Sequence, residues 1–177
     1  MATELEAQAF TAHHPVVIVG VGKVNAATAT AQACRDHDPA MVINVGKVGA
    51  LHDDHDHEPF EVGVVVQNDM DGDAIEGLIG AHPSPPIELA DQGPTLATGD
   101  RFIADATERA SLADRAHYVD MEGYAVAAAA RAHGVPVRLI KTVSDSADER
   151  AHGSWNEAVA DASHRLAAWL DEHVVQE

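Results

Sequence analysis

An acidic side chain follows an apolar segment in residues 137–148, VRLIKTVSDSAD. Residues 137–143 have the short apolar pattern of a buried strand, and Ser144 and Asp145 come directly after it. Ligands bind at the carboxyl ends of strands in open α/β sheets. A carboxyl group that is partly shielded from water there can keep its proton and act as a general acid. We therefore predict that Asp145 is a general acid, whereas a helix-capping role suits Asp148 better.

A second acid, Glu122, begins an alanine-rich segment within residues 119–136, VDMEGYAVAAAARAHGVP. The pattern predicts a helix over residues 122–133, and its many alanines indicate that another element packs closely on it. Two interpretations of Glu122 stay open. It is either a functional carboxylate or a solvated acid that stabilises the helix N-terminus.

A glycine turn joins an apolar run to a predicted helix in residues 16–31, VVIVGVGKVNAATATA. The dinucleotide-binding fingerprint needs a third glycine where Asn25 stands, and a P-loop needs Ser or Thr where Val24 stands. What remains is a strand, a turn whose backbone N–H groups can face a ligand, and a helix that starts near Asn25. An ordinary turn without a ligand fits this segment equally well.

Strand-like and helix-like patterns alternate along the chain, which predicts an α/β layered fold. Buried strands are predicted at residues 16–19, 41–45, 62–66 and 137–143, and helices at 24–35, 105–116, 122–133 and 155–174. The proline-rich run at 80–94 cannot be a central strand and is predicted to be a surface loop. The length of 177 residues predicts one domain that spans residues 1–177.

The composition argues against several classes of partner. The formal net charge is −18 and the positive charges are scattered, so nucleic acid is not expected to bind. No apolar run is long enough to span a membrane, and the first residues, MATELEAQAF, carry acids where a signal peptide carries bases. The single cysteine, Cys34, fits a small core residue in a cytoplasmic protein.

Residues 52–58, HDDHDHE, contain three histidines and four acids. Imidazole and carboxylate groups suit zinc, nickel or manganese. Structural metal sites usually draw their ligands from distant elements, however, and an acidic loop is more often simply solvated. We therefore predict no specific metal site; divalent-metal binding by this loop is the alternative interpretation.

Five segments occur in the order, and at roughly the separations, of a known superfamily. They are GVGKVNAA, VINVGKVGAL, LATGDRFI, VDMEGYAVA and VSDSAD. Together they resemble the nucleoside phosphorylase and nucleosidase superfamily, above all the methylthioadenosine/S-adenosylhomocysteine nucleosidases and short actinobacterial nucleosidases. The resemblance covers most of residues 16–170. It implies a three-layer α/β/α fold around a mixed, partly barrel-like sheet, no cofactor, and a homodimer or larger homo-oligomer whose partner helps to close the site.

The resemblance also implies roles for individual residues. Asp145 matches the acid that protonates the purine base, and Glu122 matches the carboxylate that binds the ribose. Glu6 matches a glutamate that activates water, because ATELE keeps that residue's spacing from an alanine. Acids so near a chain end are also commonly solvated and frayed. The residues matched to substrate binding are Phe102 on the base face, Ile103 on its edge, Met121 on the sugar, Ser144 beside the acid, and Trp155 near the 5′ substituent.

Lys47 departs from the superfamily pattern, because it stands where a small hydroxyl residue is usual. Its ammonium could bind an anion such as phosphate, or it could pair with Glu122. The first possibility favours phosphorolysis, and the second leaves water as the nucleophile.

The expected activity is hydrolysis of the N-glycosidic bond of purine nucleosides, with adenine nucleosides such as 5′-methylthioadenosine or S-adenosylhomocysteine as substrates. Breaking this bond builds positive charge on the sugar and negative charge on the base, so an acid at the base and a carboxylate at the sugar stabilise the transition state. The alternatives are a phosphate-dependent purine nucleoside phosphorylase and a catalytically inactive nucleoside-binding module.

Overall fold

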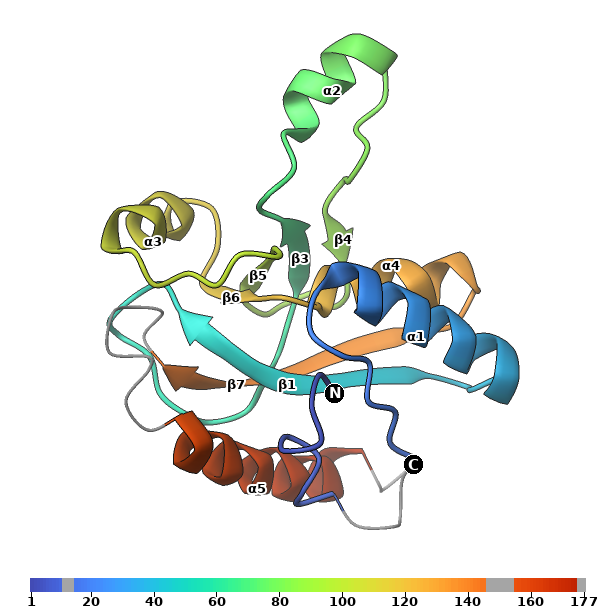
Figure 1. Ribbon diagram of the computed structural model, residues 1–177, viewed down its shortest axis with the longest axis vertical. Coiled ribbons are helices and arrows are strands. Elements are labelled where there is room, and N and C mark those ends of the chain that lie inside the picture. The colour runs from blue at the N-terminus through green and yellow to red at the C-terminus, as the bar shows by residue number, and fades with distance from the viewer. Residues whose placement is uncertain (11–14, 146–154, 175–177) are drawn as a thin grey trace.

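The computed structural model describes residues 1–10, 15–145 and 155–174, with the backbone alone for residues 144, 145 and 155–159. Its described strands form one sheet in the order β2-β7-β1-β6-β5-β3-β4 (Figure 1). The strands are β1 (Val42–Ala50), β2 (Phe60–Glu61), β3 (Val64–Gln67), β4 (Ile87–Glu88), β5 (Thr95–Thr98), β6 (Tyr118–Asp120) and β7 (Val137–Asp145). The helices are α1 (Lys23–His37), α2 (Gly72–Ile79), α3 (Ala106–Ala113), α4 (Gly123–Ala132) and α5 (Trp155–His173).

The sheet is mixed, and its two long strands form its centre. β1 pairs in parallel with β7 from Val42 opposite Val137 to Gly49 opposite Asp145. β5 lies parallel to both β3 and β6, whereas β6 meets β1 in the antiparallel sense at Gly49 and Ala50 only. Parallel neighbours bring their carboxyl ends to the same edge, so the ends of β1 and β7 lie together.

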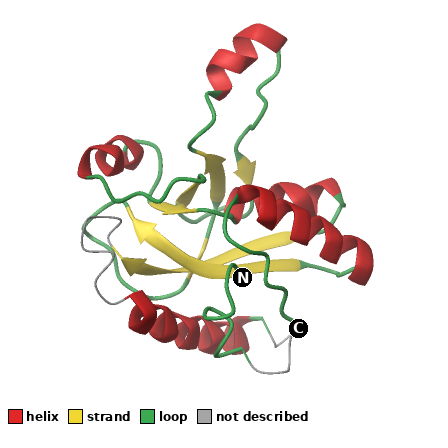
Figure 2. Cartoon of the chain, in the orientation of Figure 1, coloured by secondary structure: helices red, strands yellow, loops and turns green. Residues whose placement is uncertain are grey.

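Helices cover both faces of the central strands. α1 and α4 pack against each other on one face, and α5 packs along β1 and β7 on the other face (Figures 1 and 2). The predicted three-layer α/β/α arrangement around a mixed sheet is thereby confirmed. Parallel strands that are buried on both faces read as continuous apolar runs, which explains why β1 and β7 were predictable.

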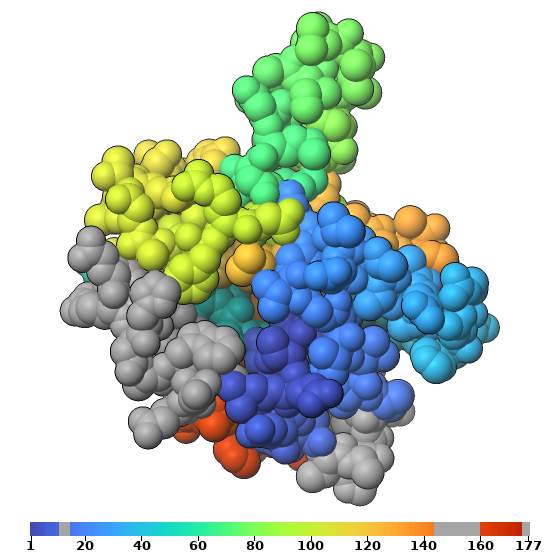
Figure 3. All heavy atoms as spheres, in the orientation of Figure 1, coloured from blue at the N-terminus to red at the C-terminus, as the bar shows by residue number. Residues whose placement is uncertain are grey.

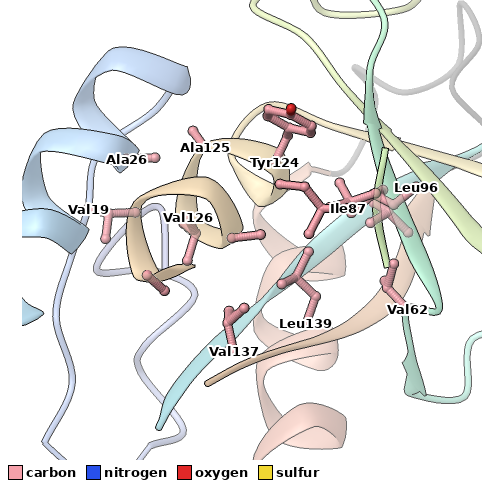
Figure 4. Close-up of a cluster of buried hydrophobic side chains, with 14 of the residues drawn as sticks. Val19, Ala26, Val62, Ile87, Leu96, Tyr124, Ala125, Val126, Val137 and Leu139 are labelled. Carbon is pink, nitrogen blue, oxygen red and sulfur yellow. The ribbon is translucent and has the colours of Figure 1, made fainter. Parts of the chain in front are cut away.

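The main hydrophobic cluster lies between the α1–α4 pair and the sheet (Figure 4). Ala125, Ala127 and Ala130 of α4 are buried in it, together with Ala26 of α1. Small side chains let two helices approach closely, so the alanine-rich pattern of α4 has the packing partner that the sequence indicated. Cys34 is buried in the same cluster, as predicted.

Two predictions about local structure were wrong. Residues 16–19 belong to no described strand, and the side chains of Val16, Val17 and Ile18 are 40%, 37% and 38% exposed. The run at 80–94 is mostly loop but contains the short strand β4, which pairs with β3 at the end of the sheet. Proline is tolerated next to such an edge strand, so the proline-rich composition did not exclude it.

The segment around α2 projects from the body of the molecule (Figure 3). Asp71 caps this helix by accepting a hydrogen bond from the Ala74 N–H, and Gly80 ends it with φ 75°. Leu78 and Ile79 at its end are 85% and 66% exposed. Among the helices of the described residues, none is both long enough and apolar enough to cross a membrane.

Candidate active site

A cavity of about 320 Å³ gathers most of the residues that the sequence singled out. Its walls come from the N-terminal segment, the turn before α1, the end of β1, the loop after β5, and the junction of β6 with α4. Glu6, Lys47, Phe102, Ile103, Met121 and Glu122 all line it. These residues are far apart in the sequence, so the fold alone assembles them.

Glu122 stands at the N-cap position of α4, but its side chain makes no capping hydrogen bond to that helix. Its Oε1 instead accepts a 2.9 Å hydrogen bond from the backbone N–H of Gly22. Burial, and next the negative charge of Asp120, raise the pKa of the Glu122 carboxyl from 4.5 to about 7. At neutral pH the protonated and ionised forms of this carboxyl are therefore present in similar amounts. A merely solvated helix cap would not show such a raised pKa.

The glycine turn before α1 places the N–H that binds Glu122. Gly20 and Gly22 have φ values of 79° and 91°, which side chains other than glycine rarely adopt. Asp100 holds the following residue, because its Oδ1 accepts a 2.7 Å hydrogen bond from the Lys23 N–H. The Lys23 ammonium in turn bonds to Asp69, whose other carboxylate oxygen accepts the Asp100 N–H. The turn therefore directs a backbone N–H to a carboxylate of the same chain, and its glycines permit the backbone conformation that this contact requires.

A buried ion pair lies behind Glu122. Lys141 Nζ is 2.9 Å from Asp120 Oδ2, and the two side chains are 2% and 1% exposed. Thr98 donates to the other oxygen of Asp120 at 2.6 Å, and the Gly123 N–H donates to Oδ2 at 2.9 Å. The Asp120 charge raises the pKa of Glu122 and the Lys141 charge lowers it.

This pair was not predicted from the sequence, although the chain carries a signal for it. Lys141 interrupts the apolar run of β7, and a lysine inside a buried strand needs a carboxylate partner. Asp120 belongs to the VDMEG segment, in which roles were predicted for Met121 and Glu122 only. Only the tertiary structure shows that the two side chains meet.

Glu6 is 7% exposed, so it is buried rather than solvated. Its Oε2 accepts a 3.0 Å hydrogen bond from the Thr3 N–H, and the Ser163 hydroxyl of α5 donates to its carbonyl oxygen at 2.6 Å. Glycine at position 46 leaves open the space beside it, since a Cβ there would lie 3.9 Å from Glu6 Oε1 and 3.5 Å from Lys141 Nζ. Glu6 and Lys141 therefore both lie close to Gly46.

The remaining predicted residues fall into two groups. Ile103 is buried in the cavity wall, Phe102 is 49% exposed, and Met121 and Lys47 are half-buried. The side chains of Ser144, Asp145 and Trp155 lie outside the described part of the structure, which gives their backbone alone. The Cα of Asp145 pairs with that of Gly49, which lines the cavity, so the backbone of the predicted acid runs beside the site.

The histidine-rich loop lies on the outer side of β7. His57 Nδ1 is 2.9 Å from the Val143 carbonyl oxygen, and the Thr142 hydroxyl donates to the His57 carbonyl at 2.5 Å. Within the described residues, no three His, Cys, Asp or Glu side chains lie close enough together to hold a metal ion. The contacts of His57 instead attach this loop to the last residues of β7.

Known proteins that are similar in sequence to this chain include nucleosidases. The sequence model of the Phosphorylase superfamily matches residues 90–174. An aminodeoxyfutalosine nucleosidase of Helicobacter pylori is 26% identical over 187 residues, with 92% of this chain and 81% of that protein covered. The 5′-methylthioadenosine/S-adenosylhomocysteine nucleosidase of Bacillus thuringiensis is 28% identical over 183 residues, with 86% and 77% covered.

Solved structures agree with these sequence matches. The corresponding nucleosidase of Neisseria meningitidis, solved with methylthio-immucillin-A, superimposes with a TM-score of 0.82 at 25% identity, covering 97% of this chain and 94% of that one. The chain is similar to the Phosphorylase superfamily over residues 90–174. The segment that matches this superfamily contains Phe102, Met121 and Glu122, whereas Glu6 and Lys47 lie outside it. Glu6 and Lys47 line the cavity although they lie outside the matched segment.

Proposed function

We propose that the protein is a nucleosidase that hydrolyses the N-glycosidic bond of purine nucleosides, with 5′-methylthioadenosine or S-adenosylhomocysteine as the substrate. The observation that carries this proposal is the position of Glu122, a half-buried carboxyl with a pKa raised to about 7, in one cavity with Glu6 and Phe102. The named activities of its relatives, all nucleosidases, support the same reaction class.

The proposed reaction uses three acids. Asp145 donates a proton to the base as the bond from the sugar carbon to the base nitrogen breaks and its electron pair moves to the base. Ionised Glu122 binds the ribose hydroxyls, and these hydrogen bonds strengthen as the sugar becomes positively charged. Glu6 takes a proton from the water whose oxygen forms the new bond to the sugar carbon. The products are free base and free sugar.

In this proposal the other predicted residues orient the substrate. Phe102, exposed at the loop after β5, stacks on the base, and the backbone of Ile103 bonds to its edge. Met121 packs on the sugar. Ser144 lies beside the acid, and Trp155 covers the 5′ substituent. In this proposal the site is completed by a second copy of the chain in a homodimer or larger homo-oligomer, and residues 1–177 act as one domain without a cofactor.

Phosphorolysis is less well supported by the charges around the cavity. Lys47 and Arg101 line it, but the Arg101 guanidinium is 73% exposed and pairs with Glu108 at 3.2 Å. A phosphate site needs several convergent donors, commonly including a bidentate arginine. The acids Glu6, Asp120 and Glu122 around the same cavity would repel a phosphate anion.

The test is release of free base from 5′-methylthioadenosine, S-adenosylhomocysteine, aminodeoxyfutalosine, adenosine and inosine, each with and without phosphate. Turnover that ignores phosphate supports the nucleosidase. Release that requires phosphate would show that the protein is a phosphorylase instead. Tight binding without turnover would show that it is a nucleoside-binding module. Glu76→Gln is the matched control, because Glu76 is an exposed acid on α2 outside the cavity.

A further inference from the structure

A hydrogen-bonded network holds the start of α1 from outside that helix. α1 has no acid in its first turn, and its N-cap residue, Gly22, makes no side-chain capping bond. Asp100, from the loop after β5, takes this role, because its Oδ1 accepts the Lys23 N–H at 2.7 Å. The unpaired N–H groups and the dipole of a helix both favour a carboxylate at this end. The start of α1 is therefore fixed by a residue 77 positions away in the sequence.

Asp69 joins this cap to a third segment of the chain. Its Oδ1 accepts a hydrogen bond from the Lys23 ammonium at 2.5 Å, and its Oδ2 accepts one from the Asp100 N–H at 2.8 Å. Gln67 Oε1, at the end of β3, accepts a bond from the same ammonium at 2.8 Å. Asp69 lies between β3 and the projecting helix α2 (Figure 1). Three separate parts of the chain therefore meet at its carboxylate.

These contacts distinguish Asp69 from an acid in an ordinary surface ion pair. Partial burial alone would raise the pKa of its carboxyl, but the hydrogen bonds from the Lys23 ammonium and the Asp100 N–H hold that pKa below its ordinary value of 3.8. The side chains of Lys23 and Asp69 are 18% and 21% exposed, whereas those of the surface pair Arg35 and Asp36 are 66% and 42% exposed. Exposed pairs contribute little to stability, but charge-assisted bonds from one carboxylate to two segments fix the geometry between them.

The network reaches the candidate site through Gly22. Asp100 accepts the Lys23 N–H, and the N–H one residue earlier, that of Gly22, donates to Glu122 Oε1 at 2.9 Å. A Cβ at Gly22 would lie 3.1 Å from Asp100 Oδ1, so the Asp100 carboxylate lies directly against the turn. A displacement of Asp100 or Lys23 would therefore move the N–H that Glu122 accepts. Asp69 itself does not line the cavity, so any effect on Glu122 passes through these two residues.

We propose that Asp69 is a positioning residue for Glu122, which acts through Asp100 and Lys23 to hold the Gly22 N–H against the Glu122 carboxyl. This inference rests on the proposed function, in which ionised Glu122 binds the ribose. Without the Asp69 carboxylate, Asp100 and Lys23 lose the partner that they share, and the Gly22 N–H loses its fixed direction. A purely structural role for Asp69 would lower the stability of the fold and leave the titration of Glu122 unchanged.

The direction in which Glu122 titrates separates this role from a simple effect of charge. Burial raises the pKa of Glu122, and the hydrogen bond from Gly22 opposes that rise, so loss of the bond moves the titration to higher pH. Removal of the negative charge of Asp69 would by itself move it to lower pH, because one anion fewer repels the ionised form. The other charged groups that face Glu122 or line its cavity are left in place by a substitution at Asp69; they are Glu6, Lys47, Arg101, Asp120 and Lys141.

The test follows the carboxyl carbon of Glu122 by NMR across pH in the wild type, Asp69→Asn and Asp69→Ala. Asparagine keeps the shape but replaces one acceptor oxygen with a donor, and alanine removes both acceptors. The Glu122 signal is assigned by its absence in Glu122→Gln. We expect the titration midpoint to rise by about one pH unit in both Asp69 variants, which lowers the ionised fraction about tenfold below the midpoint. Amide hydrogen exchange at Gly22 should become faster, because the N–H loses its acceptor.

Asp36→Asn is the matched control, because it removes one negative charge and one ion pair near the other end of α1. It should leave the midpoint of Glu122 and the exchange at Gly22 unchanged. A midpoint that stays constant or falls in both folded Asp69 variants would overturn the proposal, as would a lower Tm without any change at Glu122.

The NMR measurements need no turnover, so they test the role of Asp69 separately from the proposed activity. Absence of base release by the wild type would contradict the proposed function, whereas an unchanged Glu122 titration contradicts the positioning role alone. With a nucleoside substrate, kcat of Asp69→Asn at pH 6 should fall about tenfold with little change in KM. A normal kcat at that pH would count against the proposal.

Discussion

The backbone N–H of Gly22 and the carboxylate of Glu122 form a 2.9 Å hydrogen bond between residues separated by 100 positions in the sequence. This bond joins the turn before α1 to the start of α4, and Val21 and Glu122 of these two segments line the candidate site. Because φ at Gly22 is 91°, the direction of the N–H depends on the absence of a side chain. The bond therefore links a backbone conformation to the placement of a proposed catalytic carboxylate.

Gly22→Ala tests that link. A Cβ at this position would have a strained φ and would lie 3.1 Å from Asp100 Oδ1, so we expect a loss of about 1–3 kcal/mol in the free energy of unfolding and a fall in kcat. Gly77→Ala is the matched control, because a Cβ there meets nothing within 4 Å. That change should be neutral or stabilising. Unchanged kcat in a folded Gly22→Ala protein would show that the turn does not position Glu122.

Glu122→Gln should change both catalysis and the pH dependence of stability. Loss of the charge at the ribose should lower kcat about 10²-fold or more with little change in KM. The raised pKa of Glu122 means that the folded state favours the protonated acid, so its stabilising contribution is complete below pH 4.5 and is lost as pH rises through about 7. The variant does not titrate there, and should gain on the order of 3 kcal/mol relative to wild type between pH 4 and pH 9.

Denaturant unfolding of both proteins across this pH range measures that gain, with the exposed Glu76→Gln as the control. A constant difference at all pH values would contradict the raised pKa. Lower stability together with normal kinetics would instead mean that Glu122 acts only as a helix cap.

Removal of one partner of the Asp120–Lys141 pair should strongly lower the free energy of unfolding. Lys141→Met leaves Asp120 charged and buried, so we expect a loss of about 3–5 kcal/mol in the free energy of unfolding. Adding Asp120→Asn should recover much of this loss, because no buried charge remains unpaired. Glu61→Gln removes a partner from the more exposed Glu61–Arg138 pair and should cost only about 0–1 kcal/mol. Equal losses at the two pairs would contradict the burial argument.

Asp145→Asn tests the proposed general acid. Ligand binding should be retained, while kcat should fall by about 10² to 10⁴, the range for loss of a general acid. Single-turnover base release together with equilibrium binding of a substrate analogue separates the two effects. Near-normal turnover would remove Asp145 from the mechanism.

Lys47→Ser decides between water and phosphate as the nucleophile. We expect hydrolysis that is independent of phosphate in both proteins and equal or faster in the serine variant, because the acids around the cavity disfavour a bound anion. Base release is measured across a phosphate titration. A phosphate-dependent rate that disappears with the lysine would establish phosphorolysis instead.

The sequence by itself determined the layered α/β fold and its longest elements. β1 and β7 are buried on both faces and therefore read as apolar runs, and α1 and α4 carry alanines because they pack closely on each other. The segments that carry Glu122 and Asp145 were recognisable because chemistry concentrates where strands end. Short elements such as β2 and β6 were not predicted, since two or three residues give no periodic signal.

Only the tertiary structure decided the surroundings of the acids. The sequence left Glu122 open between a cap and a functional carboxylate. The hydrogen bond from Gly22 and the charge of Asp120, which depend on the folding of the chain, support the proposed functional role. The sequence left Glu6 open between a water-activating base and a frayed, solvated acid. Its burial and its contacts with Thr3 and Ser163 depend on the fold. The apolar run at 16–19 predicted a strand, but a strand needs a partner edge, and in the described structure this run belongs to no strand of the sheet. Local patterns record what a segment can form, whereas burial, pKa and pairing depend on which neighbours the fold supplies.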